Sequence, residues 1–415
     1  MSVGPYCPDE LAALGAICDD ERVLGTSVTS EARRARWGVT LCFFLNGAAW
    51  SSVIPRYPEI RRTLELGDLE WGLMLSVGPL AGLLFGLASA HLIRRFGSAN
   101  LAVAMQTAGI FTLNILGNAT HPAVFAVGLI LMAAFDGLCD TAMNSHGLRV
   151  QRLFSRSIIT GFHAWWSLGA VVGGLLGSAG AQLRMSVWLQ CLVLSIVFGV
   201  LAIVARYWML DGKDPFRPHD VHVPGRIPMP ILLRLLALGT LAASAAMIED
   251  SPASWGGIYM DEMFSVAPFW VGGAFVALQG AQMIGRFTGD RIIDRFGRRR
   301  TVTMGLGAAA VGMGIVVGLP SPATTILGFA IAGWGIATTI PGAMNAGDDI
   351  PGLRNGTGLT IVTAMFRIGI LLGPPTIGLL AELFGIRWAM AALPLAAVLA
   401  LALTPALGKD RRVER

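Results

Sequence analysis

The chain has 415 residues, of which 54% are hydrophobic and only 14% are charged, whereas soluble domains carry about 25% charged residues. This composition excludes an ordinary soluble protein and indicates an integral membrane protein. The net charge of +5 comes almost entirely from arginine, because Lys213 and Lys409 are the only lysines. Neither lysine lies in a GxxxxGK[ST] loop, which excludes an ATP-driven pump.

Residues 1–36 are mixed and polar, without the basic start, apolar core and cleavage site of a removable signal peptide. We expect a cytoplasmic tail there, with the first apolar run directing insertion. The five cysteines are widely spaced and form no CxxC pair, which argues against a disulfide framework or a zinc site. His219 and His222 are interpreted as loop residues, so no metal or cofactor is predicted.

A membrane span needs about 20 mostly apolar residues. Twelve such runs are predicted in chain order, near 37–55, 70–92, 99–117, 122–145, 158–182, 185–208, 230–250, 268–293, 300–319, 322–346, 357–382 and 385–407. We therefore predict an all-α polytopic membrane protein of two pseudo-symmetric six-helix bundles. Its expected parts are a tail at 1–36, a bundle at 37–208, a cytoplasmic linker at 209–229, a bundle at 230–408 and a tail at 409–415.

The basic residues predict the orientation, because Lys and Arg are retained on the cytoplasmic side of a membrane. With both termini inside, most of the 31 basic residues fall in cytoplasmic segments and one, Arg367, falls within a span. The outer loops hold Arg56, Arg61, Arg62, Arg184 and Arg387. The basic stretch GDRIIDRFGRRR at 289–300 then lies in a cytoplasmic connection, which favours topology over nucleic-acid binding as its explanation.

The two halves resemble each other in sequence. HLIRRFGSAN at 91–100 matches RIIDRFGRRR at 291–300, and SLGAVVGGLLG at 167–177 matches RIGILLGPPTIG at 367–378, both at an offset of 200. TAMNSHGLR matches GAMNAG at an offset of 201. Such repeats indicate a duplicated unit with a substrate path at the interface of the halves.

After residue 36 the chain resembles the major facilitator superfamily. The family's cytoplasmic signature, approximately GxxxDRxGRR, is matched between helices 8 and 9 by a set that the resemblance implies to be a gate: Asp294, Arg295, Gly297, Arg298 and Arg299. The leading glycine falls on Asp290, and the first-half copy has Arg94 in place of the aspartate. We expect Asp294 to contact the start of helix 5, around Arg156 to Ile158, in the outward-facing state.

Four further segments are similar to a bacterial inner-membrane branch distantly related to the fucose:proton symporters: FLNGAAWSSVIPRYPEIR, DTAMNSHG, FHAWWSLGAVVGG and LGPPTIGLLAE. Drug:proton antiporters of the twelve-helix type usually carry an arginine in helix 4 and a GP pair in helix 5. Helix 4 has Asp136 instead and helix 5 has no proline. The sequence therefore resembles the symporters more than the antiporters.

Ionisable groups at membrane depth are costly and usually face a cavity or a partner. Asp136, Asp140 and Asn144 are spaced by four in helix 4 and so share one face. Asp136 is the first candidate for proton coupling, because a carboxylate exposed to each side in turn can carry a proton. The alternative is a static interhelical hydrogen bond.

Two more groups lie at membrane depth. His163 in helix 5 has the same expected depth as Asp140, about 8 Å from the cytoplasmic end, and either shares a proton with it or is a packing group. Arg367 is expected about 15 Å into helix 11, paired with Asp136, Glu249 or an anionic substrate. A substrate-binding role and a lock between the halves are both open for Arg367.

Polar and aromatic side chains at helical spacing suggest a cavity for a small polar solute. Their alternative role is helix packing. The substrate-cavity candidates are Asn46, Trp50, Asn144, Trp166, Gln279, Gln282, Asn345 and Arg367. Glu249 and Asp250 are expected at the outer end of helix 7, where Ser251 and Pro252 should break the helix, and Asp250 is interpreted as a solvated gate residue.

These features predict proton-driven secondary transport of a small solute across the bacterial inner membrane, with the lipid bilayer, the solute and protons as partners and a monomer as the expected state. Symport is slightly favoured, export of a metabolite or drug is the runner-up, and a non-transporting sensor is the alternative of another class. An enzyme is not predicted, because no nucleophile with its base, metal cluster or cofactor loop is evident.

Overall fold

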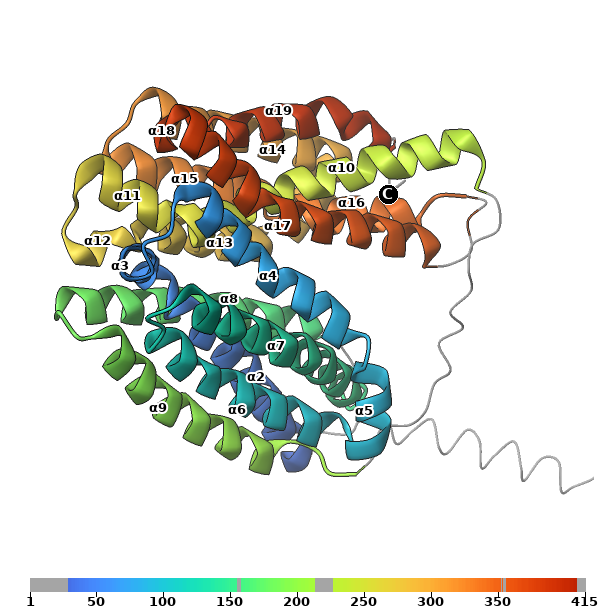
Figure 1. The fold of residues 1–415 in the computed structure, drawn as a ribbon. Coiled ribbons are helices and arrows are strands. Elements are labelled where there is room, and N and C mark those ends of the chain that lie inside the picture. The colour runs from blue at the N-terminus through green and yellow to red at the C-terminus, as the bar shows by residue number, and fades with distance from the viewer. Residues whose placement is uncertain (1–28, 155–157, 213–226, 352, 354–355, 409–415) are drawn as a thin grey trace, which may run out of the picture.

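The structure is a computed structural model that describes residues 29–154, 158–212, 227–351, 353 and 356–408. Throughout these ranges the regular elements are helices, arranged as two bundles stacked on each other (Figure 1). The sequence-based expectation of an all-α fold in two halves is confirmed.

The first bundle contains the first six predicted spans. Its helices are α2 (Ser30–Ser51), the 3-10 turn η1 (Ile54–Arg56), α3 (Tyr57–Thr63), α4 (Asp68–Gly86), α5 (Ser89–Phe96), α6 (Ser98–Gly117), α7 (Pro122–Gln151), α8 (Ile159–Gln182) and α9 (Val187–Trp208). Proline begins α7, where its missing N–H costs nothing. The second predicted span, 70–92, is divided into α4 and α5, and the first continues through η1 into α3.

The second bundle contains the other six. Its elements are α10 (Met229–Ser251), the π-turn η2 (Pro252–Gly256), α11 (Gly257–Phe264), α12 (Pro268–Val271), α13 (Gly273–Phe296), α14 (Arg298–Gly318), α15 (Pro322–Ile336), α16 (Thr339–Asp348), α17 (Thr357–Phe384), α18 (Ile386–Ala389), α19 (Ala392–Leu403) and η3 (Thr404–Leu407). Among the described residues, 11 continuous helical stretches are long and apolar enough to span a membrane. The eighth predicted span, 268–293, corresponds to α12 and α13 and is not in that set.

The expected helix break at Pro252 is wrong. Residues Pro252–Gly256 form a π-helical turn that joins α10 to α11, so one span runs continuously from Met229 to Phe264. A π-turn accommodates the missing proline N–H by widening the helix locally. The consequence is that Glu249 lies near the middle of this span instead of at its outer end.

The duplicated basic connections have the same backbone geometry. Gly97 has φ 80° and ψ 151°, and Gly297 has φ 85° and ψ 157°, a left-handed region that favours glycine. Each glycine N–H donates to the carbonyl four residues earlier, of Ile93 at 2.8 Å and of Ile293 at 2.7 Å. The sequence repeat is therefore also a structural repeat.

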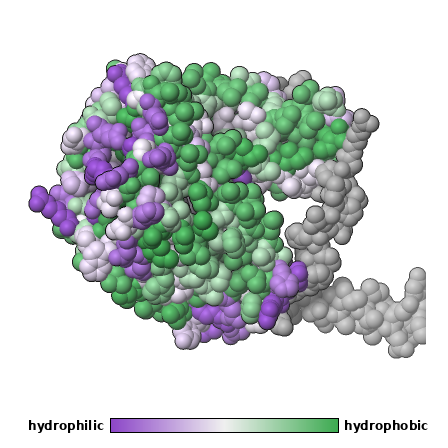
Figure 2. Space-filling model, viewed as in Figure 1, coloured by the Kyte–Doolittle hydropathy of each residue, from purple (hydrophilic) through white to green (hydrophobic). Residues whose placement is uncertain are grey.

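The two bundles touch at one end and diverge at the other. At the closed end, which carries α3, α11 and α12, hydrophilic side chains gather on the surface (Figures 1 and 2). At the open end, which carries α5 and the start of α10, a hollow separates the bundles (Figure 2). Helix α4 of the first bundle lies along α17 of the second, where Ser76 Oγ donates to the Leu371 carbonyl at 2.8 Å.

Glycines set how closely these helices approach. A Cβ on Gly72 of α4 would lie 2.5 Å from the carbonyl oxygen of Pro374 on α17, across the two bundles. Within the first bundle, a Cβ on Gly169 of α8 would lie 2.0 Å from the carbonyl oxygen of Phe44 on α2. Small residues permit such contacts between membrane helices.

Arg56 was expected in an outer loop, but its side chain is only 2% exposed and lies inside the first bundle. It donates to Glu59 at 2.6 Å, to the Gln190 amide oxygen at 2.7 Å and to the Met185 carbonyl at 2.7 Å. These bonds join α3, α9 and the connection before α9.

Arg56→Ala should lower the free energy of unfolding by about 3 kcal/mol, because it leaves buried acceptors unpaired. Denaturation of the purified protein in mixed micelles would measure this loss. Arg152→Ala is the matched control, since the exposed Arg152 side chain forms no hydrogen bond or ion pair within the described ranges. An equal loss for both variants would contradict a specific role for Arg56.

Candidate functional site

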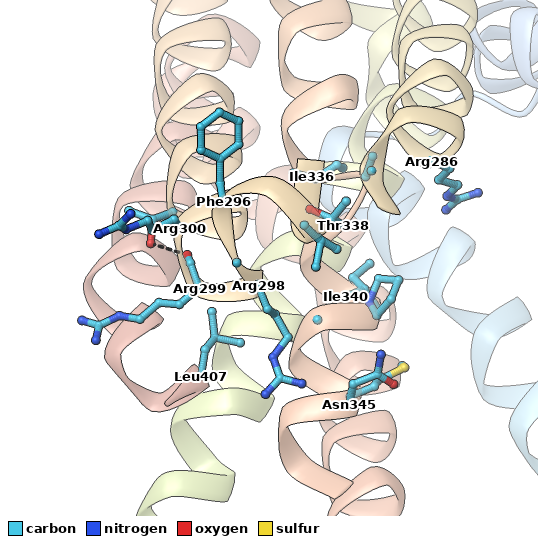
Figure 3. Close-up of a pocket in the computed structure, with 18 of the residues that line it drawn as sticks. Arg286, Phe296, Arg298, Arg299, Arg300, Ile336, Thr338, Ile340, Asn345 and Leu407 are labelled. Atoms are coloured by element: carbon cyan, nitrogen blue, oxygen red, sulfur yellow. Dashed lines mark hydrogen bonds between the residues drawn. The ribbon is translucent and has the colours of Figure 1, made fainter. Parts of the chain in front are cut away.

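The hollow at the open end is a cavity of about 3080 Å³. This volume exceeds the roughly 300–1,000 Å³ of ligand pockets, so the hollow is a vestibule with a binding region inside it. Figure 3 shows Arg298, Arg299 and Arg300 on one side of this space and Arg286 apart from them. Three of the predicted proton-coupling and substrate-cavity residues line it, namely His163, Gln282 and Asn345. All five residues of the predicted gate also line it: Asp294, Arg295, Gly297, Arg298 and Arg299.

An ion pair lies deep in this vestibule. Arg286 Nη2 of α13 donates to Glu249 Oε1 of α10 at 3.1 Å, and Arg286 Nη1 donates to Ser167 Oγ of α8 in the other bundle at 3.1 Å. The Arg286 and Glu249 side chains are 29% and 20% exposed, respectively. The pair is thus accessible from the vestibule, and Arg286 bridges the two bundles.

Sequence reasoning missed Arg286, because its nearness to the basic stretch at 289–300 assigned it to the cytoplasmic charges. A signal was present in the spacing. Gln279, Gln282 and Arg286 recur at three and four residues, which places them on one face of a helix. Gln282 is 1% exposed and Gln279 is 6% exposed, and neither amide oxygen has a hydrogen-bond partner in the described part of the chain.

A second polar cluster, which we call the Asp136 cluster, lies in the first bundle. The Asn46 amide nitrogen donates to Asp136 Oδ1 at 2.8 Å and to Gln106 Oε1 at 3.3 Å. The Trp166 indole N–H donates to Asn46 Oδ1 at 2.8 Å, and Cys139 Sγ donates to Gln106 at 3.2 Å. The structure therefore joins three of the sequence-based candidates, Asn46, Asp136 and Trp166.

Asp136 lies midway along α7, about 22 Å from either end at 1.5 Å per residue. The surrounding protein leaves its side chain exposed, and within the described ranges its hydrogen-bond partner is an uncharged amide. Asp136, Asn46, Trp50, Gln106 and Cys139 are among the residues around a second cavity of about 20 Å³. A space of this size holds about one water molecule, next to the carboxyl group.

The other intramembrane charges are arranged differently from the expectation. Asp140 Oδ1 accepts from the Asn144 amide at 2.9 Å and is in electrostatic range of Arg367 on α17. Glu249 pairs with Arg286 and Asp136 accepts from Asn46, and within the described residues no ion pair joins Arg367 to either acid.

His163 is exposed, with its ring edge-on to Phe43 at 5.2 Å between centroids. It is in electrostatic range of Arg286. No hydrogen bond joins it to Asp140 among the residues that the structure describes.

Charged groups connect the bundles at the closed end. Arg61 donates to Glu262 of α11 at 2.8 Å, and Arg62 pairs with the neighbouring Asp261. The Leu69 N–H at the start of α4 donates to a Glu382 carboxylate oxygen at 3.3 Å, and the Trp71 indole donates to the Ser254 carbonyl at 3.3 Å. These contacts cross from the first bundle to the second and hold this end together.

At the open end, the motif residues contact their own bundle. Arg298 pairs with Asp349 after α16 at 2.8 Å, and the Arg295 guanidinium lies 5.3 Å from the Phe296 ring. Asp294 lines the vestibule. Of its expected contact segment, Arg156 to Ile158, the first two residues lie outside the described ranges.

In the first bundle, a hydrogen bond from Arg206 holds the pKa of Asp211, after α9, below its usual range. The described ranges contain no group of three or more His, Cys, Asp or Glu that could hold a metal ion, and His219 and His222 lie outside them. Cys42, Cys139 and Cys191 are buried free thiols, whereas Cys7 and Cys18 also lie outside.

Comparisons with known proteins agree on the class. A sequence model of the Major Facilitator Superfamily matches residues 238–415. An uncharacterized MFS-type transporter of Yersinia pestis is 25% identical over 83% of this chain and 88% of its own length. A crystal structure of the nucleoside transporter NupG (D323A mutant) has a TM-score of 0.73 at 12% identity, covering 90% of this chain and all of that one.

FucP in its outward conformation has a TM-score of 0.60 at 15% identity, covering 90% of this chain and 99% of that one. The fold, the match over the second half and the likeness along both halves identify a multi-pass membrane transporter, not an enzyme. The chain matches the Major Facilitator Superfamily over residues 238–415 and is similar over most of its length to transporters of that type.

Proposed function

We propose that the chain transports a small solute across the bacterial inner membrane with a proton, by alternating access between two halves at 37–208 and 230–408. The basic residues around the open end favour the cytoplasm for that side. Both termini would then also be cytoplasmic. On this assignment the structure is the inward-facing state, with the outer side closed by the contacts of Arg61, Arg62 and Glu382.

One observation carries the proton coupling. Asp136 is an accessible carboxyl group in the middle of a span, with a neutral hydrogen-bond partner and room for one water beside it. A carboxylate at membrane depth without a cation is costly, so proton uptake stabilises Asp136 as access changes from one side of the membrane to the other. The Asn46 amide keeps the group oriented in either protonation state, because the protonated acid retains a carbonyl oxygen as acceptor.

We expect Asp136→Asn to abolish accumulation driven by a pH gradient while leaving equilibrative exchange intact, since the amide keeps the shape and loses the proton. Proteoliposomes would be offered a defined mixture of sugars, nucleosides and amino acids, and the trapped solutes quantified by mass spectrometry. Asp211→Asn is the control, a carboxyl-to-amide change outside the spans.

Infrared titration adds a readout that needs no solute. Subtracting the Asp136→Asn spectrum from that of the unaltered protein should isolate one protonated carboxylic acid band that grows as the pH falls. If the variant accumulates solutes as well as the unaltered chain does, Asp136 is not the proton carrier. Reversing the imposed gradient separates uptake from the runner-up, export.

A further inference from the structure

The vestibule contains a neutral site built from two opposite charges. The Arg286–Glu249 pair has a single contact at 3.1 Å, and within the described residues no hydrogen bond reaches the second oxygen of Glu249. A partly exposed pair of this kind is weak. A ligand that offers each partner a better-placed opposite charge can therefore separate the two side chains.

Charge balance selects the kind of ligand. A simple anion would take Arg286 and leave the Glu249 carboxylate unpaired at membrane depth, and a simple cation would leave Arg286 unpaired. Unpaired charges there are costly. A molecule with one carboxylate and one ammonium group satisfies both and keeps the site neutral. A carboxylate also fits the planar guanidinium fork with two parallel hydrogen bonds.

Neighbouring groups fit the ammonium end. Gln282 lies one helical turn from Arg286 on α13 and lines the vestibule, and its amide oxygen has no partner among the described residues. An ammonium group has three donors, so it can bond Glu249 and Gln282 together. Ser167 of the other bundle already contacts Arg286, which brings both halves to the same site.

We propose that Arg286 and Glu249 bind a zwitterionic solute of the amino acid type, with its carboxylate on Arg286 and its ammonium on Glu249 and Gln282. This deepens the proposed transport function and rests on it. The site is distinct from the Asp136 cluster, so proton coupling and substrate charge selection are assigned to separate carboxylates.

Matched probes test the proposal on the purified full chain in detergent. Alanine, glutamine, leucine and phenylalanine are each compared with the 2-hydroxy acid that lacks the ammonium group and the amine that lacks the carboxylate. Thermal stability and titration calorimetry measure binding. At least one amino acid should bind about tenfold or more tighter than both of its analogues, because each analogue loses a charge-assisted hydrogen bond.

The variants identify the two ends. Arg286→Gln should remove the preference for the carboxylate, and Glu249→Gln should let the hydroxy acid bind about as well as the amino acid. Arg286→Lys, which keeps the charge and loses the fork, should weaken binding yet keep the selectivity, and it covers the case in which the glutamine variant does not fold. Arg291→Gln is the charge-matched control on the same helix.

Equal binding of an amino acid and either analogue would overturn the proposal. So would the absence of binding by all four amino acids. Either result could occur together with Asp136-dependent accumulation of a sugar or nucleoside. In that case the zwitterion site would be contradicted, and the proposed proton-coupled transport would still hold. Conversely, selective amino acid binding without gradient-driven accumulation would support the site and contradict proton coupling.

Discussion

Gly72→Ala is expected to shift the protein toward an outward-open state and to slow transport about tenfold or more. The added Cβ would lie 2.5 Å from the Pro374 carbonyl oxygen, a backbone atom of the other half. Overpacking of this kind costs about 1–3 kcal/mol, and 1.4 kcal/mol changes a population ratio about tenfold. The cost falls on the outer-closed state alone, because alternating access would separate α4 from α17 at that end.

The measurement is labelling of a reporter cysteine at Ser76 from the outer side, in a chain whose native cysteines are replaced. Ser76 bonds the Leu371 carbonyl across the halves and should react only when they part. Gly78→Ala is the control on the same helix, since its Cβ would lie 3.7 Å from the Ala133 side chain, an ordinary contact. Equal outer labelling in the two variants would contradict a closing role for Gly72.

Gly169→Ala should prevent folding, in contrast to Gly72→Ala. Its Cβ would lie 2.0 Å from the Phe44 carbonyl oxygen, between α8 and α2 of the same half. Rigid-body rocking moves whole halves and offers no state in which this contact is relieved. The expected loss is about 3 kcal/mol or more of unfolding free energy, which for marginally stable proteins is a large fraction of the total.

Yield of monodisperse protein and its melting temperature would measure this effect. Gly161→Ala, on the same helix with nothing within 4 Å of the added Cβ, should leave both unchanged. A different result would be a Gly169→Ala protein that folds normally and whose reporter cysteine at position 76 is strongly labelled from the outer side. This result would show that α2 and α8 move relative to each other. That outcome would also contradict the rigid halves of the proposed cycle.

Most of the fold could be predicted from the sequence, because membrane spans follow from apolar length alone. The spans at 99–117 and 185–208 nearly coincide with α6 and α9. The predicted helix break at Pro252 was wrong because packing of the whole helix outweighed the local preference of proline. Pro252 usually ends a helix, but here a π-turn carries the chain through it.

The candidate site could be predicted only in part. The four-residue spacing identified the face of Asp136, and the structure adds its contact with Asn46 on another helix. Arg286 and Glu249 lie on different spans, and each was assigned to a membrane surface because of charged or helix-breaking neighbours. Pairing between helices leaves no trace in a one-dimensional hydropathy pattern, so their meeting could not be deduced.

The charge content of α13 has a consequence for biogenesis. A lone arginine near the middle of a helix costs about 2.5–3.5 kcal/mol on insertion scales, and Arg286 lies near the middle of α13. Its partner Glu249 lies on the span synthesised immediately before it. We expect the seventh and eighth spans to leave the translocon as a helical hairpin, with the ion pair neutralised before either helix meets lipid.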